Sequence, residues 1–172
     1  MLHIVYANEG TSPYDHFFIR KFSLKYRVTF VTFSLYEPRI RLNPLSFTLR
    51  PKYKQLKFPT GVDVIALPPV PVLGYIPTLS LNLMLTLPFK AYVFRRAIHK
   101  INPNLIIGNS ALSYGFISAI SNFRPFILFV WGSDVLLYPE KSPFLRWLVK
   151  YSLLKADAII VDSDIQFKKC IK

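Results

Sequence analysis

Cysteine and histidine are scarce in this sequence, and their scarcity excludes several classes of protein. The 172 residues include a single cysteine, Cys170, so we expect neither a disulfide framework nor a cysteine-rich metal site. The three histidines, His3, His16 and His99, lie far apart in the sequence, and no HExxH-type pair is present. A zinc hydrolase is therefore not expected, and no metal ligands are assigned.

Acidic residues are also few, with 9 Asp and Glu against 22 Lys and Arg, which gives a formal net charge of +13. They are scattered without a close carboxylate pair, so a self-contained glycosidase site is not expected. Hydrophobic residues make up 52% of the chain, which excludes a disordered protein. A chain both basic and apolar has three candidate partners: a membrane surface, a nucleic acid or an anionic substrate. Nucleic acid is disfavoured because no RNA- or DNA-binding module is recognisable.

The charge is unevenly distributed along the sequence. Basic residues crowd the stretch from Arg20 to Lys57, where only Glu37 opposes them, and no charged residue occurs from Val64 to Phe89. That uncharged stretch has three interpretations: a buried strand, loop and helix; a segment partly inserted into a membrane interface; or a membrane span. Its five prolines disfavour the span, because each interior proline removes a helical hydrogen bond. The N-terminus lacks the pattern of a signal peptide, so we expect a cytoplasmic protein.

Apolar runs typical of buried strands alternate with helical patterns along the whole chain. The expected strands are 2–6, 28–33, 62–67, 105–107, 126–131 and 158–161, and the expected helices are 12–24, 79–101, 111–121, 142–154 and a short one after Ser163. Pro88 should kink the helix 79–101 or start a new one. This alternation predicts an α/β, doubly wound, mostly parallel sheet with helices on both faces, in three layers.

Ligands of such sheets bind at the carboxyl ends of the strands, so the loops that follow the strands are the candidate site. Four of these loops are small and polar, and they span residues 8–13, 108–110, 131–134 and 162–164. Their exposed amides favour an anionic or hydroxyl-rich ligand. The dinucleotide fingerprint GxGxxG, the P-loop GxxxxGK[ST] and the hydrolase elbow GxSxG are all missing from the sequence.

Most of the polar candidates in these loops also have a purely structural interpretation. These alternatives are a turn cap for Asp134, helix N-caps for Ser110 and Ser163, a surface or satisfied histidine for His16, and a core side chain for Trp131. Glu9 has no such alternative, because a carboxylate near the end of a sheet is not needed for folding.

Four stretches of the sequence follow one another in an order typical of one enzyme family. They are Ala7-Asn8-Glu9-Gly10 with Asp15-His16, then Asn102-Pro103-Asn104-Leu105-Ile106-Ile107, then Val130-Trp131-Gly132-Ser133-Asp134-Val135, and finally the stretch from Leu153 to Ser163. In this order they resemble the N-terminal half of a GT-B glycosyltransferase of the retaining, family-4 kind. The resemblance spans essentially the whole chain, which would be a single Rossmann-like domain, 1–172.

The resemblance implies a two-domain enzyme whose N-terminal domain receives the acceptor and whose C-terminal domain binds a nucleotide-sugar donor. Gly10 would face the donor phosphates, and Glu9, Ser12 and His16 would border the acceptor. The cleft near the transferred sugar would be lined by Trp131, Gly132, Ser133 and Asp134, joined by Ser110 and Ser163 from the other strand ends. Asp134 is the candidate for a catalytic role. Many relatives carry a histidine where Trp131 stands, so a histidine-based mechanism is not transferred.

The resemblance also implies what the chain works with. The sequence stops at Lys172 without a donor-binding domain. A C-terminal domain or a partner chain would supply this donor-binding half, and the chain alone would be inactive as a hexosyltransferase. No cofactor is expected, since the nucleotide sugar is a substrate. The basic and apolar N-terminal half favours a lipid-linked or membrane-proximal glycan acceptor, with the protein peripheral at the inner face of the cell membrane. The alternative is a non-enzymatic membrane-surface or assembly subunit that retains the fold.

Overall fold

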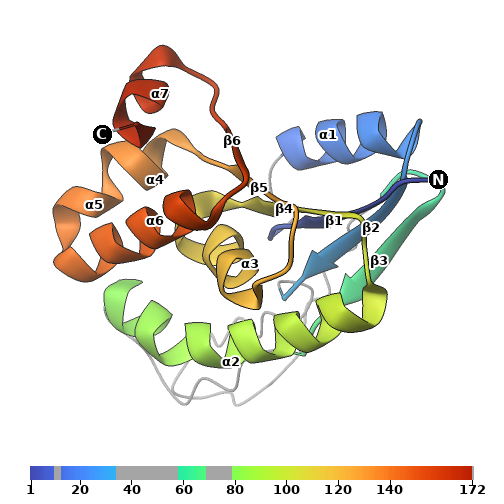
Figure 1. The fold of residues 1–172 in the computed structure, drawn as a ribbon, viewed down its shortest axis with the longest axis horizontal. Coiled ribbons are helices and arrows are strands. Elements are labelled where there is room, and N and C mark those ends of the chain that lie inside the picture. Colours follow the sequence, from blue (N-terminus) through green and yellow to red (C-terminus); the bar gives the residue numbers. More distant parts are fainter. Residues whose placement is uncertain (10–12, 34–57, 69–78, 172) are drawn as a thin grey trace, which may run out of the picture.

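The structure is a computed structural model that describes residues 1–9, 13–33, 58–68 and 79–171 (Figure 1). Its strands are β1 (His3–Ala7), β2 (Arg27–Thr32), β3 (Val62–Ala66), β4 (Leu105–Asn109), β5 (Phe126–Phe129) and β6 (Ala158–Ile160). Its helices are α1 (Pro13–Ser23), α2 (Leu79–Ile101), the π-helical turn η2 (Ser110–Tyr114), α3 (Gly115–Ser121), α4 (Gly132–Leu136), α5 (Tyr138–Lys141), α6 (Pro143–Lys155) and α7 (Asp164–Cys170).

All six strands pair in parallel, in the order β3-β2-β1-β4-β5-β6. The chain builds outward from β1 to β3 in one direction, crosses back through α2, and then builds from β4 to β6 in the other. The strand order therefore reverses between β1 and β4, as in doubly wound nucleotide-binding folds. The predicted fold class is confirmed.

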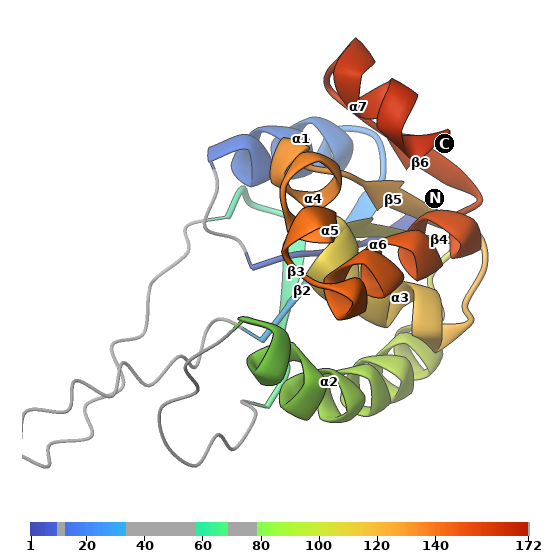
Figure 2. The same cartoon turned by 90° about the vertical axis from the view of Figure 1, so that its left-hand side faces the viewer.

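Helices cover both faces of the sheet, because successive side chains of each strand point to opposite sides. In β1, Ile4 and Tyr6 pack toward α1, together with Ile19. The residues that alternate with them, Val5 and Ala7, join the larger core beneath α2, α3 and α6. Figure 2 shows these three layers, with α1 on one side of the sheet and α2 on the other.

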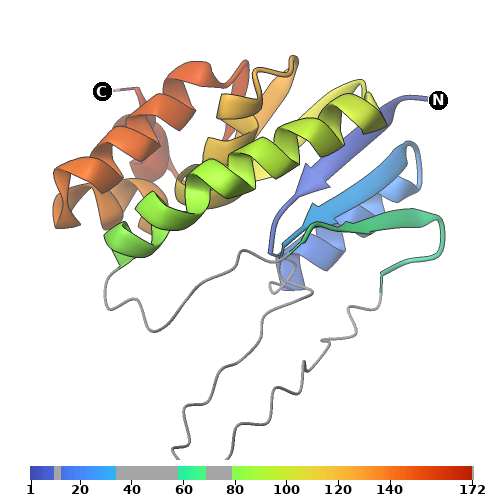
Figure 3. The same ribbon diagram turned by 90° about the horizontal axis from the view of Figure 1, so that it is seen from below.

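Helix α2 is continuous through Pro88, so the expectation of a second helix starting there is wrong (Figure 3). Proline removes one backbone hydrogen bond, but its ring lies on an exposed side of the helix. Buried residues on both sides of it, including Leu83, Ala91 and Phe94, anchor the two halves to the same core. Among the described residues, no helix combines the length and apolar character that a membrane span requires.

Two further differences separate the structure from the expected elements. Residues 132–136 form the short helix α4, where a polar loop over 131–134 was expected, and residues 138–141 form α5, for which no element was expected. The last strand, β6, is exposed rather than buried, and among the described residues it pairs on one side only, with β5. The helices α4 and α5 are ambiguous in sequence because each contains less than two helical turns.

Asp157 and Asn104, which belong to the motifs quoted above, link neighbouring strands at the amino end of the sheet. Asp157 accepts hydrogen bonds from the Phe126 amide and from Arg124, and thereby ties the start of β6 to the start of β5. The Phe126 hydrogen bond is the main cause that lowers the pKa of the Asp157 carboxyl. Asn104 likewise accepts from the His3 amide and joins the start of β4 to that of β1.

Candidate functional site

The candidate site lies at the carboxyl ends of β1, β4 and β5, in the middle of the sheet. The reversal of strand order between β1 and β4 leaves the connections after these two strands on opposite faces. Asn8 follows β1 directly and Asn109 is the last residue of β4, so both lie at this reversal. The first turn of α4 follows β5 at the same edge.

A buried polar cluster joins β1, α1 and β4 at this edge. One carboxylate oxygen of Asp15, Oδ1, accepts hydrogen bonds from the Tyr6 hydroxyl at 2.9 Å, from Asn8 Nδ2 at 2.6 Å and from Asn109 Nδ2 at 3.1 Å. Asn109 Nδ2 also lies 2.9 Å from the Tyr6 hydroxyl oxygen. These bonds fix the start of α1 over the sheet, because Asp15 belongs to the first turn of that helix.

Tyr6 serves this cluster as a donor. Burial raises the pKa of the Tyr6 hydroxyl well above its ordinary range, and the negative charge of Asp15 raises it further. The hydroxyl therefore stays protonated at physiological pH and keeps its hydrogen bond to the carboxylate. Tyr6 therefore supports the geometry of the candidate site as a hydrogen-bond donor.

A second buried carboxylate, Asp134, joins β4 to the turn that follows β5. Its Oδ1 accepts from the Ser110 hydroxyl at 3.1 Å, and its Oδ2 accepts from the amides of Ala111 at 2.9 Å and Trp131 at 3.1 Å. The side chain is only 2% exposed. Burial raises the pKa of the Asp134 carboxyl, and these hydrogen bonds oppose that shift. Asp134 thus caps its own turn, as its structural alternative predicted, and also holds Ser110.

Ser110 adopts a backbone conformation that is rare for a residue with a side chain. Its φ of 67° lies in the left-handed region, at the point where β4 turns into the π-helical η2. Strained residues and π-helical turns are both frequent at functional sites. Ser110 is therefore not a helix N-cap, because it lies within η2 after Asn109 and its hydroxyl donates to Asp134.

Gly115 makes room for this turn, and we expect Gly115→Ala to destabilise the protein by about 1–3 kcal/mol. A Cβ at this position would lie 2.6 Å from the Ser110 carbonyl oxygen and 2.3 Å from Leu128 Cδ1. The leucine can move, but the carbonyl belongs to the backbone of the site. Urea unfolding measures the change. The matched control is Gly132→Ala, whose Cβ would meet nothing closer than 3.4 Å and should cost little. Equal stability of both variants would contradict the expectation.

Aromatic side chains border the site on the side of β5. The Trp131 ring lies 5.9 Å from the Tyr14 ring and 5.2 Å from the Phe129 ring, measured between centroids. Phe129 in turn contacts Phe18 of α1, with the rings 5.2 Å apart. Tyr14 is 63% exposed and Trp131 is half-buried, so the pair presents ring surface to solvent beside Asp134.

The structure brings some of the predicted site residues together and separates others. Ser110, Trp131 and Asp134 form one hydrogen-bonded unit, and Gly132 and Ser133 begin α4 beside it. Glu9 is exposed directly after β1. Gly10 and Ser12 lie outside the described residues.

His16 and Ser163 lie apart from that unit. His16 stacks on Phe58, with the rings 5.3 Å apart, on the side of α1 that faces β2, whereas Tyr14 faces Trp131. Ser163 accepts from the Gln166 amide and is the N-cap of α7, as its structural alternative predicted. Gln166 is the member of α7 that packs near Gly132.

Sequence reasoning placed Asn8 and Asn109 in the candidate loops without giving either a role, and it missed Tyr6 and Tyr14. Asn8 and Asn109 carried a usable signal, because each ends a strand, and doubly wound folds place those two strands side by side. Tyr14 and Tyr6 carried none, since aromatic residues in an amphipathic helix or a buried strand are ordinary core residues. No group of His, Cys, Asp and Glu among the described residues is arranged to hold a metal ion.

Solved structures of other proteins share this fold, and the three that follow are all longer than the chain. Sucrose-phosphate synthase from Thermosynechococcus elongatus aligns with a TM-score of 0.63 and 16% identity, over 98% of this chain and 44% of that one. A UDP-glucosyltransferase from Polygonum tinctorium aligns with a TM-score of 0.60 and 12% identity, over 99% of this chain and 48% of that one. A Listeria monocytogenes protein assigned as a UDP-N-acetylglucosamine 2-epimerase aligns with a TM-score of 0.60 and 11% identity, over 99% of this chain and 41% of that one. The chain therefore spans less than half of each.

These likenesses define the chain as a Rossmann-like α/β domain of the kind found in GT-B glycosyltransferases. At such low identity they show the fold alone. The sequence itself is more specific, since residues 56–163 match the family described as "Glycosyl transferase 4-like". The chain belongs to this family, as its motifs predicted. No curated protein sequence matches it.

Proposed function

We propose that this chain is the acceptor-binding half of a glycosyltransferase, which transfers a hexose from a nucleotide sugar to a lipid-linked or membrane-proximal glycan. The observation that carries the proposal is the polar and aromatic site at the carboxyl ends of β1, β4 and β5 in a chain of the glycosyl transferase 4-like family. The donor would be bound mainly by a second domain, in this protein or in a partner chain. The chain alone would be inactive, and it would need no cofactor.

The site residues support an acceptor rich in hydroxyl groups. The Ser110 hydroxyl donates a hydrogen bond to Asp134 and keeps oxygen lone pairs that can accept from a sugar hydroxyl. Trp131 and Tyr14 offer ring faces against which the C–H face of a sugar can pack. In this proposal Asp134 is a positioning residue, because all three of its hydrogen bonds are made within the protein. Glu9 and the tip of α4 would border the acceptor, and Gly10 would face the donor phosphates, as the family resemblance implies.

The charge of the chain supports an acceptor held at a membrane. A net charge of +13 attracts anionic lipid headgroups, at about 1 kcal/mol for each basic residue near the surface. Exposed apolar residues on α2, among them Met84 and Leu85, add surface that can enter an interface. The proposal therefore places the protein in the cytoplasm, peripheral at the inner face of the cell membrane.

Transfer by membranes from cells that lack this gene tests the proposal. Purified chain is added to these membranes together with the donor-binding domain or partner chain that completes it and a panel of radiolabelled nucleotide sugars, and lipid-extractable label is measured. We expect the wild-type chain to restore incorporation from one donor, and Tyr14→Ala to lower the restored rate about ten-fold through the lost ring contact. Phe17→Ala, which removes a comparably exposed aromatic residue of the same helix, should act like wild type.

The contrary outcomes are equally specific. If the wild-type chain restores no transfer from any donor although it binds the membranes, the non-enzymatic assembly subunit becomes the better interpretation. If the purified chain alone turns over a nucleotide sugar, the assignment of half an enzyme is wrong. Equal rates for Tyr14→Ala and Phe17→Ala would remove the aromatic pair from the acceptor site.

A further inference from the structure

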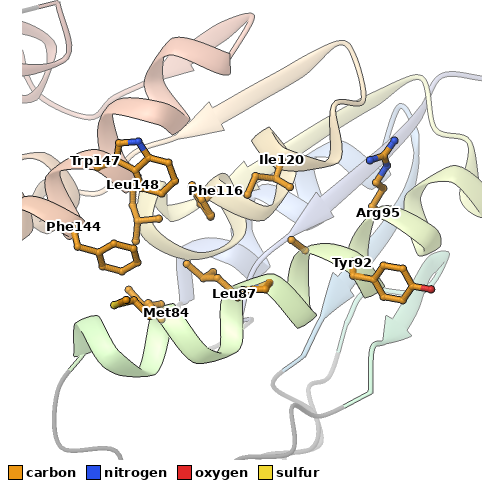
Figure 4. Close-up of a pocket in the computed structure, with 12 residues that line it drawn as sticks. Met84, Leu87, Tyr92, Arg95, Phe116, Ile120, Phe144, Trp147 and Leu148 are labelled. Carbon is orange, nitrogen blue, oxygen red and sulfur yellow. The ribbon is translucent and has the colours of Figure 1, made fainter.

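An apolar groove lies on the other face of the sheet from α1, between α2, α3 and α6 (Figure 4). Its volume is about 520 Å³, within the range of about 300–1,000 Å³ that small-molecule sites occupy. Phe144 and Trp147 of α6 close one end opposite Met84, and Leu87 and Phe116 form part of the wall. None of these residues belongs to the candidate site at the strand ends. We call this feature the α2–α6 groove.

The α2–α6 groove is exposed although it is apolar. Met84 is 54% exposed and Trp147 is 52% exposed, while Leu87 and Phe116 beneath them are buried. The Trp147 ring is held in place by Phe116 at 5.6 Å and Tyr151 at 5.7 Å between centroids. Covering an open apolar concavity of this kind with another apolar group lowers the free energy, because apolar surface is removed from water.

The helices that line the α2–α6 groove carry charges of one sign. The sequences of α2, α3 and α6 contain no Asp or Glu, whereas α2 and α6 carry Lys and Arg. One cation, Arg95, lies at the end of the groove remote from Trp147 (Figure 4). Met84 and Arg95 are eleven positions apart on α2, which corresponds to about 16 Å along the helix. The groove therefore has an extended apolar body and a cationic end.

We propose that the α2–α6 groove binds one hydrocarbon chain of an anionic lipid, with the lipid phosphate at Arg95. The apolar wall and the elongated shape fit a hydrocarbon chain, and the guanidinium is suited to a phosphate. The lack of acidic side chains on the lining helices favours an anionic amphiphile over a zwitterionic one or an ordinary amphipathic helix of mixed charge. This inference rests on the membrane clause of the proposed function, but it does not depend on the transfer reaction.

Fluorescence quenching by a brominated lipid tests the α2–α6 groove directly, because the chain has only two tryptophans. Trp147 lines the groove, and Trp131 lies at the candidate site. The probe is short-chain phosphatidylglycerol with brominated acyl chains, used below its critical micelle concentration. With excitation selective for tryptophan, we expect saturable quenching in Trp131→Phe, where Trp147 is the sole tryptophan, and little quenching in Trp147→Phe.

Two matched pairs of variants in the Trp131→Phe background separate the groove from general charge effects. Met84→Glu and Leu85→Glu change the net charge equally at neighbouring exposed positions of α2, but only Met84 lines the groove. We expect Met84→Glu to weaken lipid binding about ten-fold or more, and Leu85→Glu about two-fold or less. Arg95→Gln should weaken it about five-fold, whereas Lys100→Gln, which removes a cation from the opposite side of the helix, should have a smaller effect.

Several outcomes would overturn the proposal. These are equal quenching of both tryptophans, equal binding of brominated phosphatidylcholine, quenching only by vesicles and not by the monomeric lipid, or equal effects of Met84→Glu and Leu85→Glu. A doubled mass in light scattering together with a shielded Trp147 would assign the groove to a second copy of the chain instead. Failure of the transfer assay with intact lipid binding would contradict the proposed function and leave the groove assignment standing.

Discussion

Replacing Asp15 with alanine should remove about 3–5 kcal/mol of folding stability, a large share of the total for a domain of this size. The substitution takes away the one carboxylate oxygen that accepts from Tyr6, Asn8 and Asn109. Their donors would remain buried without that acceptor, and each such donor costs about 1–3 kcal/mol. Tyr6 belongs to β1, Asn8 follows that strand directly, and Asn109 ends β4. The loss would therefore loosen the centre of the sheet.

Urea unfolding of Asp15→Ala, followed by circular dichroism, measures this loss. Asp63→Ala is the matched control, because Asp63 forms an exposed ion pair with Arg27 and should contribute less than about 1 kcal/mol. Asp15→Asn should fall between them, since it retains an acceptor oxygen and loses only the negative charge. A cost below about 1 kcal/mol for Asp15→Ala would show that the cluster does not support the fold.

The second large effect concerns Asp134. Replacing it with alanine should lower the free energy of unfolding by about 3 kcal/mol, and replacing it with asparagine should lower it by less than about 1 kcal/mol. Alanine leaves the amides of Ala111 and Trp131 and the Ser110 hydroxyl without their acceptor. Asparagine can place its oxygen toward the two amides and its NH₂ group toward Ser110, whose hydroxyl can rotate to accept. The same urea measurement applies. Similar losses for the two variants would mean that the charge of Asp134, rather than its acceptor geometry, stabilises the turn.

The pH dependence of stability distinguishes these two roles of Asp134. Burial raises the pKa of its carboxyl in the folded state, so protonation favours the folded protein. The stabilisation from this group is complete below the pKa of the unfolded state, near 3.8, and is lost as pH rises through the folded pKa. Relative to Asp134→Asn, the wild-type protein should therefore gain stability as pH falls from neutrality. A difference that stays constant with pH, measured by urea unfolding at several pH values, would contradict the raised pKa.

The order of elements was predictable because it depends on local pattern. Runs such as those at β1, β2 and β5 are continuously apolar, and the segments between them repeat with a helical period, which favours a parallel sheet covered on both faces. The position of the candidate site was predicted from the same pattern, since ligands of such sheets bind at the carboxyl ends of the strands. The family motifs led to the same fold and to the glycosyl transferase 4-like family.

The contacts within the site were not predictable from pattern alone. Nothing near Asp15 in the sequence indicates that its carboxylate would accept from Asn109, which is 94 positions away. The motif Asp134 was a candidate for catalysis, but its hydrogen bonds are all made within the protein, and this arrangement favours a positioning role. His16 and Tyr14 are two positions apart on α1, and a helix directs such residues to different sides, so only one of them lies beside Trp131.

By itself, the sequence determined the fold class, the strongly basic charge and the family of the chain, and it predicted the strand ends that carry the candidate site. These properties follow from local hydrophobic periodicity, composition and short motifs, which require no knowledge of which strands are neighbours. Only the tertiary structure decided that Asp15 and Asp134 would be buried in separate hydrogen-bonded clusters, that Ser110 would be strained, and that α2 and α6 would leave an apolar groove. The reason is physical: each of these features depends on side chains distant in sequence, and their positions are set by packing rather than by local propensity.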